Sequence, residues 1–214
     1  MFIGHYAVGL AAKRAAPRAS LTALVAAAAW ADILFTFLHL AGIEKAGVDL
    51  ASGKFMPIVL IDLPWSHSLL MSVLWAMLLA GGYYAVRRYQ AGAEWIALGV
   101  LSHWALDWLT HRPDMMLVPG GARYGLGLWD HPAATAVVEG GFFALAAWLY
   151  AGAAPAKDAA GRWGYRLFVA ALAALYVSTF FSPPPPSEGA MRVANVVLLL
   201  VSLAWCMFLD RHRG

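Results

Sequence analysis

Charged residues are scarce in this chain. Only 13% of its 214 residues are charged, while 62% are hydrophobic and the mean hydropathy is +0.66. A water-soluble domain carries about 25% charged residues, so this composition excludes an ordinary soluble protein. Several apolar runs approach the ~20 residues that a helix needs to cross a ~30 Å hydrocarbon core. We therefore predict an all-α integral membrane protein, with residues 1–214 forming a single polytopic domain.

Cysteine is almost absent as well. Cys206 is the only one, which excludes an intramolecular disulfide and leaves the redox compartment open. The sequence pI is near 9.1, but the basic residues lie at the ends of apolar runs, so they predict membrane orientation and no nucleic-acid partner. The N-terminal "MFIGHYAVGLAAKRAA" lacks positive charge ahead of its apolar stretch, so we expect no cleaved secretory signal.

The apolar runs predict a short N-terminal helix near residues 2–16, followed by six transmembrane helices. The expected cores of these six are 19–41, 65–86, 93–111, 132–153, 164–182 and 189–209. Pro64 and Pro132 stand where the second and fourth spans open, a position at which proline is tolerated. The stretch "SPPPPSEG" predicts a stiff, extended connector between the fifth and sixth.

Lysine and arginine predict the orientation of these spans. Ten fall on one side of a six-span arrangement and five on the other, which places both termini in the cytoplasm. The two longest loops, 42–63 and 112–130, then face outward. Both loops are rich in apolar residues, and loops of this length often act as lids. We expect them to cover an outer opening.

Polar groups inside the apolar runs are the main functional signal. In "SHWALDWLTH", His103, Asp107 and His111 lie on one helical stripe within roughly 80°, since each residue turns the helix by ~100°. A buried carboxylate without a partner is costly, so such groups should meet others. The candidates on other predicted helices are His5, Asp32, His67 and Glu139.

Imidazole and carboxylate groups without a thiolate are a ligand set for Zn²⁺ or another divalent transition metal. The H-x₃-D pair of His103 and Asp107 places two such groups on one face, one turn apart. The sequence therefore predicts a divalent metal as cofactor, with zinc as the expected ion. The predicted ligand set is His5, Asp32, His67, His103 and Asp107. A metal in this place would lower the pKa of a water and polarise a phosphoryl or carbonyl oxygen.

Four stretches, "MFIGHYAVGL", "WADILF", "PWSHSLL" and "LSHWALDWLTHRPD", occur in the order and with roughly the spacing seen in one family. On these motifs the first 115 residues or so resemble the bacterial membrane-bound metal-dependent hydrolases, and most closely a subgroup that continues with "HRPD" and "GLGLW". The resemblance implies a multi-pass protein of the bacterial inner membrane, with the five ligands above as the family's polar positions. Two departures reduce the ligands for a second metal: Asp32 is followed by Ile33 and Leu34 instead of completing a D-x-D pair, and "LPWSHS" replaces a longer histidine motif.

These observations favour a metal-dependent hydrolase acting on a lipidic or amphipathic substrate from the outer half of the membrane. His67, His103 and Asp107 would hold the ion, with Asp32 and His5 as further ligands or as supporting groups. The expected general base is Glu139 or His111. The expected phosphate-binding residues are Arg112 and Arg123, and membrane lipid is the expected partner.

Two other functions stay open at this point. The same polar residues could relay protons or coordinate a carried ion in a transporter, although inverted repeats, which often accompany transport, are not evident. A b-type haem protein would use axial histidines on facing helices. Haem accounts for the histidines but not for Asp32, Asp107 and Glu139, which favour a harder cation.

Overall fold

The computed structural model describes residues 1–49, 56–183 and 187–214, and over these residues the fold is all-α, as predicted. The helices are α1 Phe2–Ala15, α2 Leu21–Ala28, α3 Trp30–Leu40, α4 Leu69–Arg87, α5 Gln90–Thr110, α6 Pro132–Ala153, α7 Ala159–Ser178 and α8 Glu188–His212. Short strands are β1 Lys45–Val48, β2 Ile58–Asp62, β3 Met115–Met116 and β4 Arg123–Tyr124, and one 3₁₀ turn, η2, covers Leu128–Asp130.

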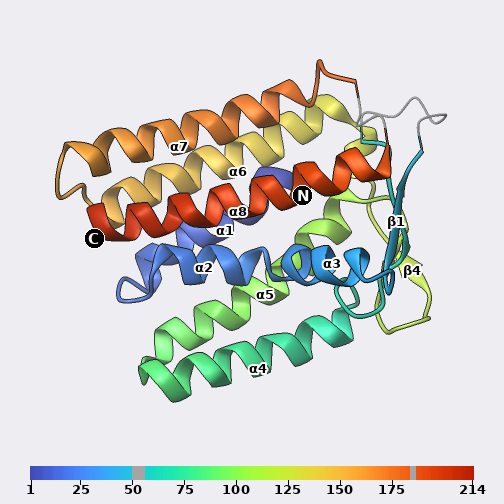
Figure 1. Ribbon diagram of the computed structural model, residues 1–214, viewed down its shortest axis with the longest axis horizontal. Helices are drawn as coiled ribbons and strands as arrows, with labels where there is room; N and C mark the ends of the chain where they lie inside the picture. Colours follow the sequence, from blue (N-terminus) through green and yellow to red (C-terminus); the bar gives the residue numbers. More distant parts are fainter. Residues whose placement is uncertain (50–55, 184–186) are drawn as a thin grey trace.

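Figure 1 shows the helices running roughly along one axis, with α6, α7 and α8 on one side, α4 and α5 on the other, and α1 and α2 between them. The strands gather at one end of the bundle, and the C-terminus lies at the opposite end (Figure 1). The polar residues predicted from the sequence lie toward the strand end, so this is the end at which a site can form.

The N-terminal helix α1 is an internal helix and contacts α2, α5, α6 and α7. Most of its residues are buried, including Ile3, Leu10 and even Lys13, whose ammonium donates to the Ala19 carbonyl at 2.7 Å. Gly9 permits a close approach to α2, because a Cβ at this position would lie 2.8 Å from the Val25 Cα. A helix packed on all sides needs this mixture of apolar and small residues.

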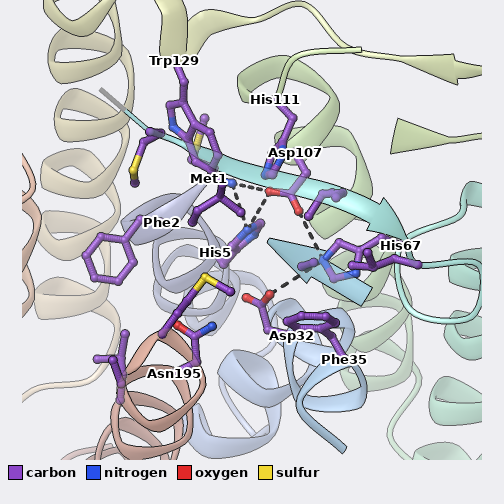
Figure 2. Close-up of a pocket in the computed structure, with 18 of the residues that line it drawn as sticks. Met1, Phe2, His5, Asp32, Phe35, His67, Asp107, His111, Trp129 and Asn195 are labelled. Atoms are coloured by element: carbon purple, nitrogen blue, oxygen red, sulfur yellow. Dashed lines mark hydrogen bonds and ion pairs between the residues drawn. The ribbon is translucent and has the colours of Figure 1, made fainter. Parts of the chain in front are cut away.

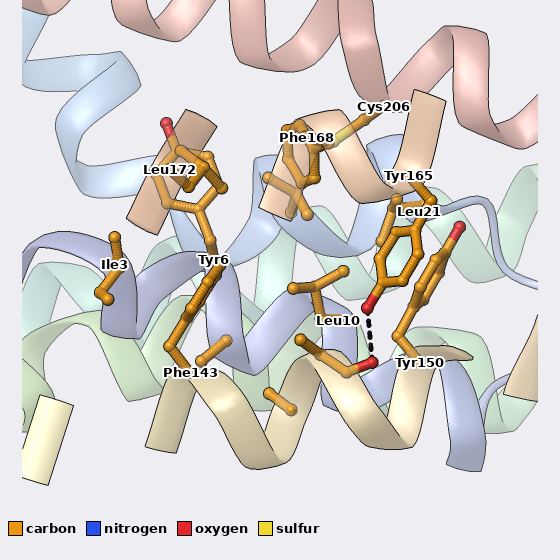
Figure 3. Packing of buried hydrophobic residues seen from close by; sticks show 14 of the residues in the cluster. Ile3, Tyr6, Leu10, Leu21, Phe143, Tyr150, Tyr165, Phe168, Leu172 and Cys206 are labelled. Atoms are coloured by element: carbon orange, nitrogen blue, oxygen red, sulfur yellow. Dashed lines mark hydrogen bonds between the residues drawn. The ribbon is translucent and has the colours of Figure 1, made fainter. Parts of the chain in front are cut away.

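A large apolar cluster joins α1 to α2, α6, α7 and α8 (Figure 3). Its largest fully buried side chains include Leu10, Tyr150 and Phe168. The Tyr165 hydroxyl, at the edge of the cluster, donates to the Ala147 carbonyl at 2.5 Å. Burying an aliphatic or aromatic side chain of this size contributes about 1.5–3 kcal/mol, so the cluster is the main packing core of the bundle.

Three helices, α4, α6 and α8, are long and apolar enough to span a membrane, and α2 with α3 makes a fourth candidate if the bent pair counts as one span. The expectation of six spans is therefore not met. Helices do occupy the other two predicted positions, but α5 carries Glu94 and Asp107, and α7 carries Arg162 and Arg166. These polar residues lower the apolar character that a span requires.

The predicted first span, 19–41, is not one continuous helix. It breaks at Ala29, and the axes of α2 and α3 differ by 62°. Ser20 caps the start of α2 by accepting a hydrogen bond from the Ala23 amide at 3.1 Å. Neither proline nor glycine stands at the break, so the pattern of apolar residues alone predicts an uninterrupted helix.

The two long loops form small antiparallel ladders at the strand end. In loop 42–63, β1 pairs with β2, and Ala46 and Leu60 pack against Phe35 and Trp104. In loop 112–130, β3 pairs with β4, and the Leu117 carbonyl accepts the Leu70 amide at 2.9 Å. Part of the first loop, residues 50–55, lies outside the described residues. The described parts pack against the helices, as expected for lids.

Candidate metal centre

All five residues predicted as metal ligands meet at one place near the strand end of the bundle. Figure 2 shows four of them, His5, Asp32, His67 and Asp107. His5 comes from α1, Asp32 from α3, His67 from the turn before α4, and both His103 and Asp107 from α5. The three histidines and Asp107 are buried, while the side chain of Asp32 is 53% exposed and lines a cavity. Four separate chain segments therefore converge on one polar centre.

Asp107 lies at the middle of this centre. One of its oxygens, Oδ2, is 3.2 Å from His103 Nε2 and 3.7 Å from His67 Nε2, and the other, Oδ1, is 3.1 Å from His5 Nε2. Asp32 Oδ1 lies 3.8 Å from both His67 Nε2 and His103 Nε2. Two ligands of a tetrahedral zinc ion with ~2.0–2.1 Å bonds lie about 3.3–3.5 Å apart, so these separations suit a common ion.

The protonation of His103 follows from its second ring nitrogen. His103 Nδ1 lies 2.8 Å from the Ala28 carbonyl oxygen, and since a carbonyl only accepts, Nδ1 carries the proton. Nε2 is then the lone-pair nitrogen, and within the described residues it has no hydrogen-bond partner. Metal-binding histidines are commonly held in this manner by a backbone carbonyl.

His67 is held in the same tautomer by a short hydrogen-bond chain. The Ser66 hydroxyl donates to Glu44 Oε2 at 2.6 Å, so Ser66 Oγ accepts from His67 Nδ1 at 2.7 Å. Glu44 is fully buried, and its Oε1 accepts the backbone amides of Trp65 and Ser66 at 2.8 and 2.9 Å. The chain leaves His67 Nε2 facing Asp32 and Asp107, which is the orientation that a ligand needs.

His5 completes the centre from α1. Its ring stacks on that of His103, with centroids 3.8 Å apart and planes 4° from parallel. The Met1 amino group donates to Asp107 Oδ1 and lies 3.2 Å from His5 Nε2. A positive charge thus already contacts the central carboxylate, and the electrostatic preference of the site is for a cation.

A cavity of about 310 Å³ opens directly onto this centre. Its polar wall includes His5, Asp32, His67 and Asp107, and the rest of its lining is mainly apolar. Residues of both lid loops line it, among them Leu60 and Trp129, and Figure 2 shows Trp129 at its edge. An apolar cavity with a few convergent polar groups is the usual form of a small-molecule site.

The two predicted general bases differ in where they lie. His111 lines the cavity, packs against Trp129 with ring centroids 4.3 Å apart, and places Nδ1 3.3 Å from Asp114 Oδ1. Glu139 is fully buried on α6, and its Oε1 accepts the Gly4 amide of α1 at 3.2 Å. Glu139 does not line the cavity and instead faces the N-terminal turn of α1.

The two predicted phosphate-binding arginines do not line the cavity either. Arg123 donates to the carbonyls of Leu60 and Ile61 at 2.9 and 2.6 Å, which joins β4 to β2. Arg112 lies 3.8 Å from Asp49 Oδ2. In this structure both arginines therefore hold the two lid loops together.

Glu44 and Ser66 are supporting residues that sequence reasoning did not single out as part of the site. Glu44 lies in an irregular stretch, "GIEKAG", with no periodicity to place it on a buried face. Ser66 directly precedes His67 in "PWSHS", and this adjacency is the only signal that could have suggested the contact between them.

Comparisons with family models, with curated proteins and with solved structures found no match to this chain. The geometry described above therefore carries the functional argument.

Proposed function

We propose that the protein is a metal-dependent hydrolase of the bacterial inner membrane that acts on a lipidic or amphipathic substrate. The observation that carries this proposal is the convergence of three histidines and two aspartates beside an apolar cavity. The resemblance of the first 115 residues to the membrane-bound metal-dependent hydrolases supports the same assignment.

One ion accounts for the donor set better than two. Two groups of possible ligands, His5–His103–Asp107 and Asp32–His67–His103, share His103. Only Nε2 of His103 is free for a metal, because the Ala28 carbonyl holds Nδ1. We therefore assign one divalent ion near His103 Nε2, Asp107 and His67, with Asp32 and His5 as further ligands, and zinc as the ion.

When bound, the ion would activate a water and polarise the oxygen of a phosphoryl or carbonyl group. His111 lines the cavity near Asp114 and would take up a proton from that water. Glu139 acts by positioning, since its carboxylate holds the N-terminal turn of α1, which carries His5. The apolar lining and the lid loops limit access of bulk water.

The orientation in the membrane follows from the two ends of the bundle. Opposite the strands, Arg18 stacks over the ring of Tyr89, and the amides of Leu21 and Thr22 donate to Asp210. This end gathers most lysines and arginines, so we assign it, together with the C-terminus, to the cytoplasm. This assignment does not extend to the N-terminus, because Met1 is buried in the polar centre near the strand end.

Transport and haem binding are less well supported. The apolar cluster of α1, α6, α7 and α8 fills the bundle between the cavity and the basic end, where a transport path would run. The rings of His5 and His103 stack 3.8 Å apart, so they leave no space for a porphyrin between them.

Elemental analysis of the purified protein tests the proposal. We expect about one zinc per chain in the unmutated protein and in His212→Ala, and almost none in His103→Ala or Asp107→Asn. The same four samples are incubated with vesicles of bacterial phospholipids, and mass spectrometry follows the products. Unchanged metal content in both site variants, or lipid turnover equal in all four samples, would refute the proposal.

A further inference from the structure

A second hollow lies between α7 and α8 on the membrane-facing side of the bundle. Its volume is about 850 Å³, and its lining from α7 and α8 is apolar apart from Ser178 and Thr179. The space exists because α8 carries small residues here: Gly189, Ala190 and Ala194. We refer to it as the α7–α8 groove.

The groove lies next to the cavity at the metal centre. Phe2, Thr179, Ala194 and Leu198 line both spaces, so the two share one wall. Figure 2 shows Phe2 on one side of the cavity and Asn195 of α8 below it, with the histidines and aspartates beyond. A molecule lying in the groove would therefore be separated by a few side chains at most from the cavity that Asp107 and His5 line.

The exposed face of the groove is suited to hydrocarbon. Val193, Val197 and Val201 follow one another at four-residue spacing along α8 and are 65%, 53% and 52% exposed. They lie on a helix that is apolar and long enough to span a membrane. The groove runs along α8 from Gly189 to Val201, which corresponds to about 18 Å of helix.

We propose that the α7–α8 groove holds one hydrocarbon chain of a membrane lipid while the polar part of that lipid lies at the metal centre. The inference rests on the proposed function and makes its substrate more specific: an amphiphile that enters sideways from the bilayer. An apolar chain gains free energy on leaving water, but it gains little on leaving lipid. The groove therefore selects by shape and position, and its wall directs the polar group toward Asp107.

Photolabelling in detergent tests the groove. The probe is phosphatidylglycerol with a diazirine in one acyl chain, titrated against the purified protein, and labelled peptides are mapped by mass spectrometry. Val197→Trp fills the groove without touching the metal cavity, and Leu200→Trp is the matched control, because Leu200 is 62% exposed on the same helix but does not line the groove.

We expect saturable labelling of residues 175–201 in the unmutated protein and in Leu200→Trp. In Val197→Trp the apparent affinity should fall at least about tenfold, because the indole overpacks the space that the chain would occupy. Val193→Trp, one turn away, should repeat this result if Val197→Trp is poorly folded. Labelling that does not saturate, or that is equal in Val197→Trp and Leu200→Trp, would overturn the inference.

Zinc content measured on the same samples separates this inference from the proposed function. Saturable labelling in a protein without metal would support the groove as a lipid-chain site and reject the hydrolase. A protein that contains zinc but shows no saturable labelling would retain the metal centre and reject the groove.

Discussion

The two faces of α1 contact two very different environments. One face, with Tyr6 and Leu10, belongs to the large apolar cluster, in which two tyrosine hydroxyls have partners: that of Tyr6 donates to Ser202 at 3.0 Å, and that of Tyr176 donates to the Thr135 carbonyl at 3.0 Å. The other face carries His5 into the polar centre. There, among the described residues, His5 Nδ1 and His103 Nε2 are buried without a hydrogen-bond partner.

Unpaired buried polar atoms cost about 1–3 kcal/mol each, and native proteins usually avoid them. The unpaired atoms of His5 and His103 lie among the other groups of the polar centre, which indicates that this centre is arranged for a ligand, whereas the apolar cluster contributes mainly stability. The comparison predicts that changes in the two regions have separable effects on unfolding and on metal binding.

The largest effect is expected from the apolar cluster. Phe168→Ala removes a fully buried ring and should lower the free energy of unfolding by about 3–5 kcal/mol. Unfolding in detergent, followed by circular dichroism, measures this change. Zinc content per folded chain should stay equal to that of the unmutated protein. If the variant folded stably but lost its metal, the two regions would not be separable.

Glu44→Gln changes the support of the polar centre. The side-chain NH₂ of glutamine would take the place of the Glu44 oxygen that accepts from the Ser66 hydroxyl. Ser66 would then no longer fix the tautomer of His67. Loss of such a supporting group lowers metal affinity about 10–100-fold, so we expect a shift of this size in a zinc titration against a competing chelator. Glu94→Gln, on the exposed part of α5, is the control. Equal affinity in both variants would show that the chain of hydrogen bonds does not act on the metal.

Tyr165→Phe provides a finer test of the apolar region. It removes only the hydroxyl that donates to Ala147, at a buried position, and should cost about 0.5–1.5 kcal/mol of stability. The same unfolding measurement detects it, and zinc affinity should not change. A stability loss as large as that of Phe168→Ala would mean that the hydroxyl, and not the ring packing, dominates here.

The smallest effect concerns the pH dependence at the basic end. Asp158 caps α7 by accepting the Gly161 amide at 2.6 Å, and it contacts His212 Nδ1 at 2.7 Å. These contacts, the Gly161 amide foremost, hold the pKa of Asp158 below its usual 3.8. A lowered carboxyl pKa gives stability that is present above pH 3.8 and is lost as pH falls through the lower, folded-state value.

Asp158→Asn keeps a capping side chain but removes the charge. Its melting temperature should therefore fall less between pH 5 and pH 3 than that of the unmutated protein, a range that brackets the usual pKa of about 3.9 for Asp. Because Asp158 is exposed, the difference should be small and should leave zinc content at pH 7 unchanged. Parallel melting curves for the two proteins would contradict this assignment.

The sequence predicted the positions of most helices and the convergence of the polar residues, because both follow from local patterns. The apolar run that Pro132 opens predicted α6 with the bounds that the structure has, and the one-turn spacing of His103 and Asp107 placed both on the same face. The polar residues had to converge because isolated polar groups among apolar helices are costly. Such convergence is expected whichever helices are neighbours.

The rest depended on contacts that no local pattern records. The bend at Ala29 has no breaker residue, and Glu44 reaches His67, through Ser66, only when loop 42–63 brings its two ends together. The arginines predicted to bind phosphate instead contact lid residues: Arg123 donates to Leu60 and Ile61, because unpaired carbonyls at the edge of β2 lie beside it. Apolar content alone also overestimated the number of spans, since an internal helix such as α5 resembles a membrane helix in sequence.

The break between α2 and α3 has a consequence for how this site can vary among related proteins. The acceptor that fixes the tautomer of His103 is the backbone oxygen of Ala28, the last residue of α2, where a helix leaves its carbonyls without internal partners. Any residue that fits at position 28 supplies the same oxygen. This contact is made by the main chain, so it depends on the shape of the bend and not on the side chain at position 28. Related proteins that keep the bend can therefore keep the tautomer of the histidine with another residue that fits at this position.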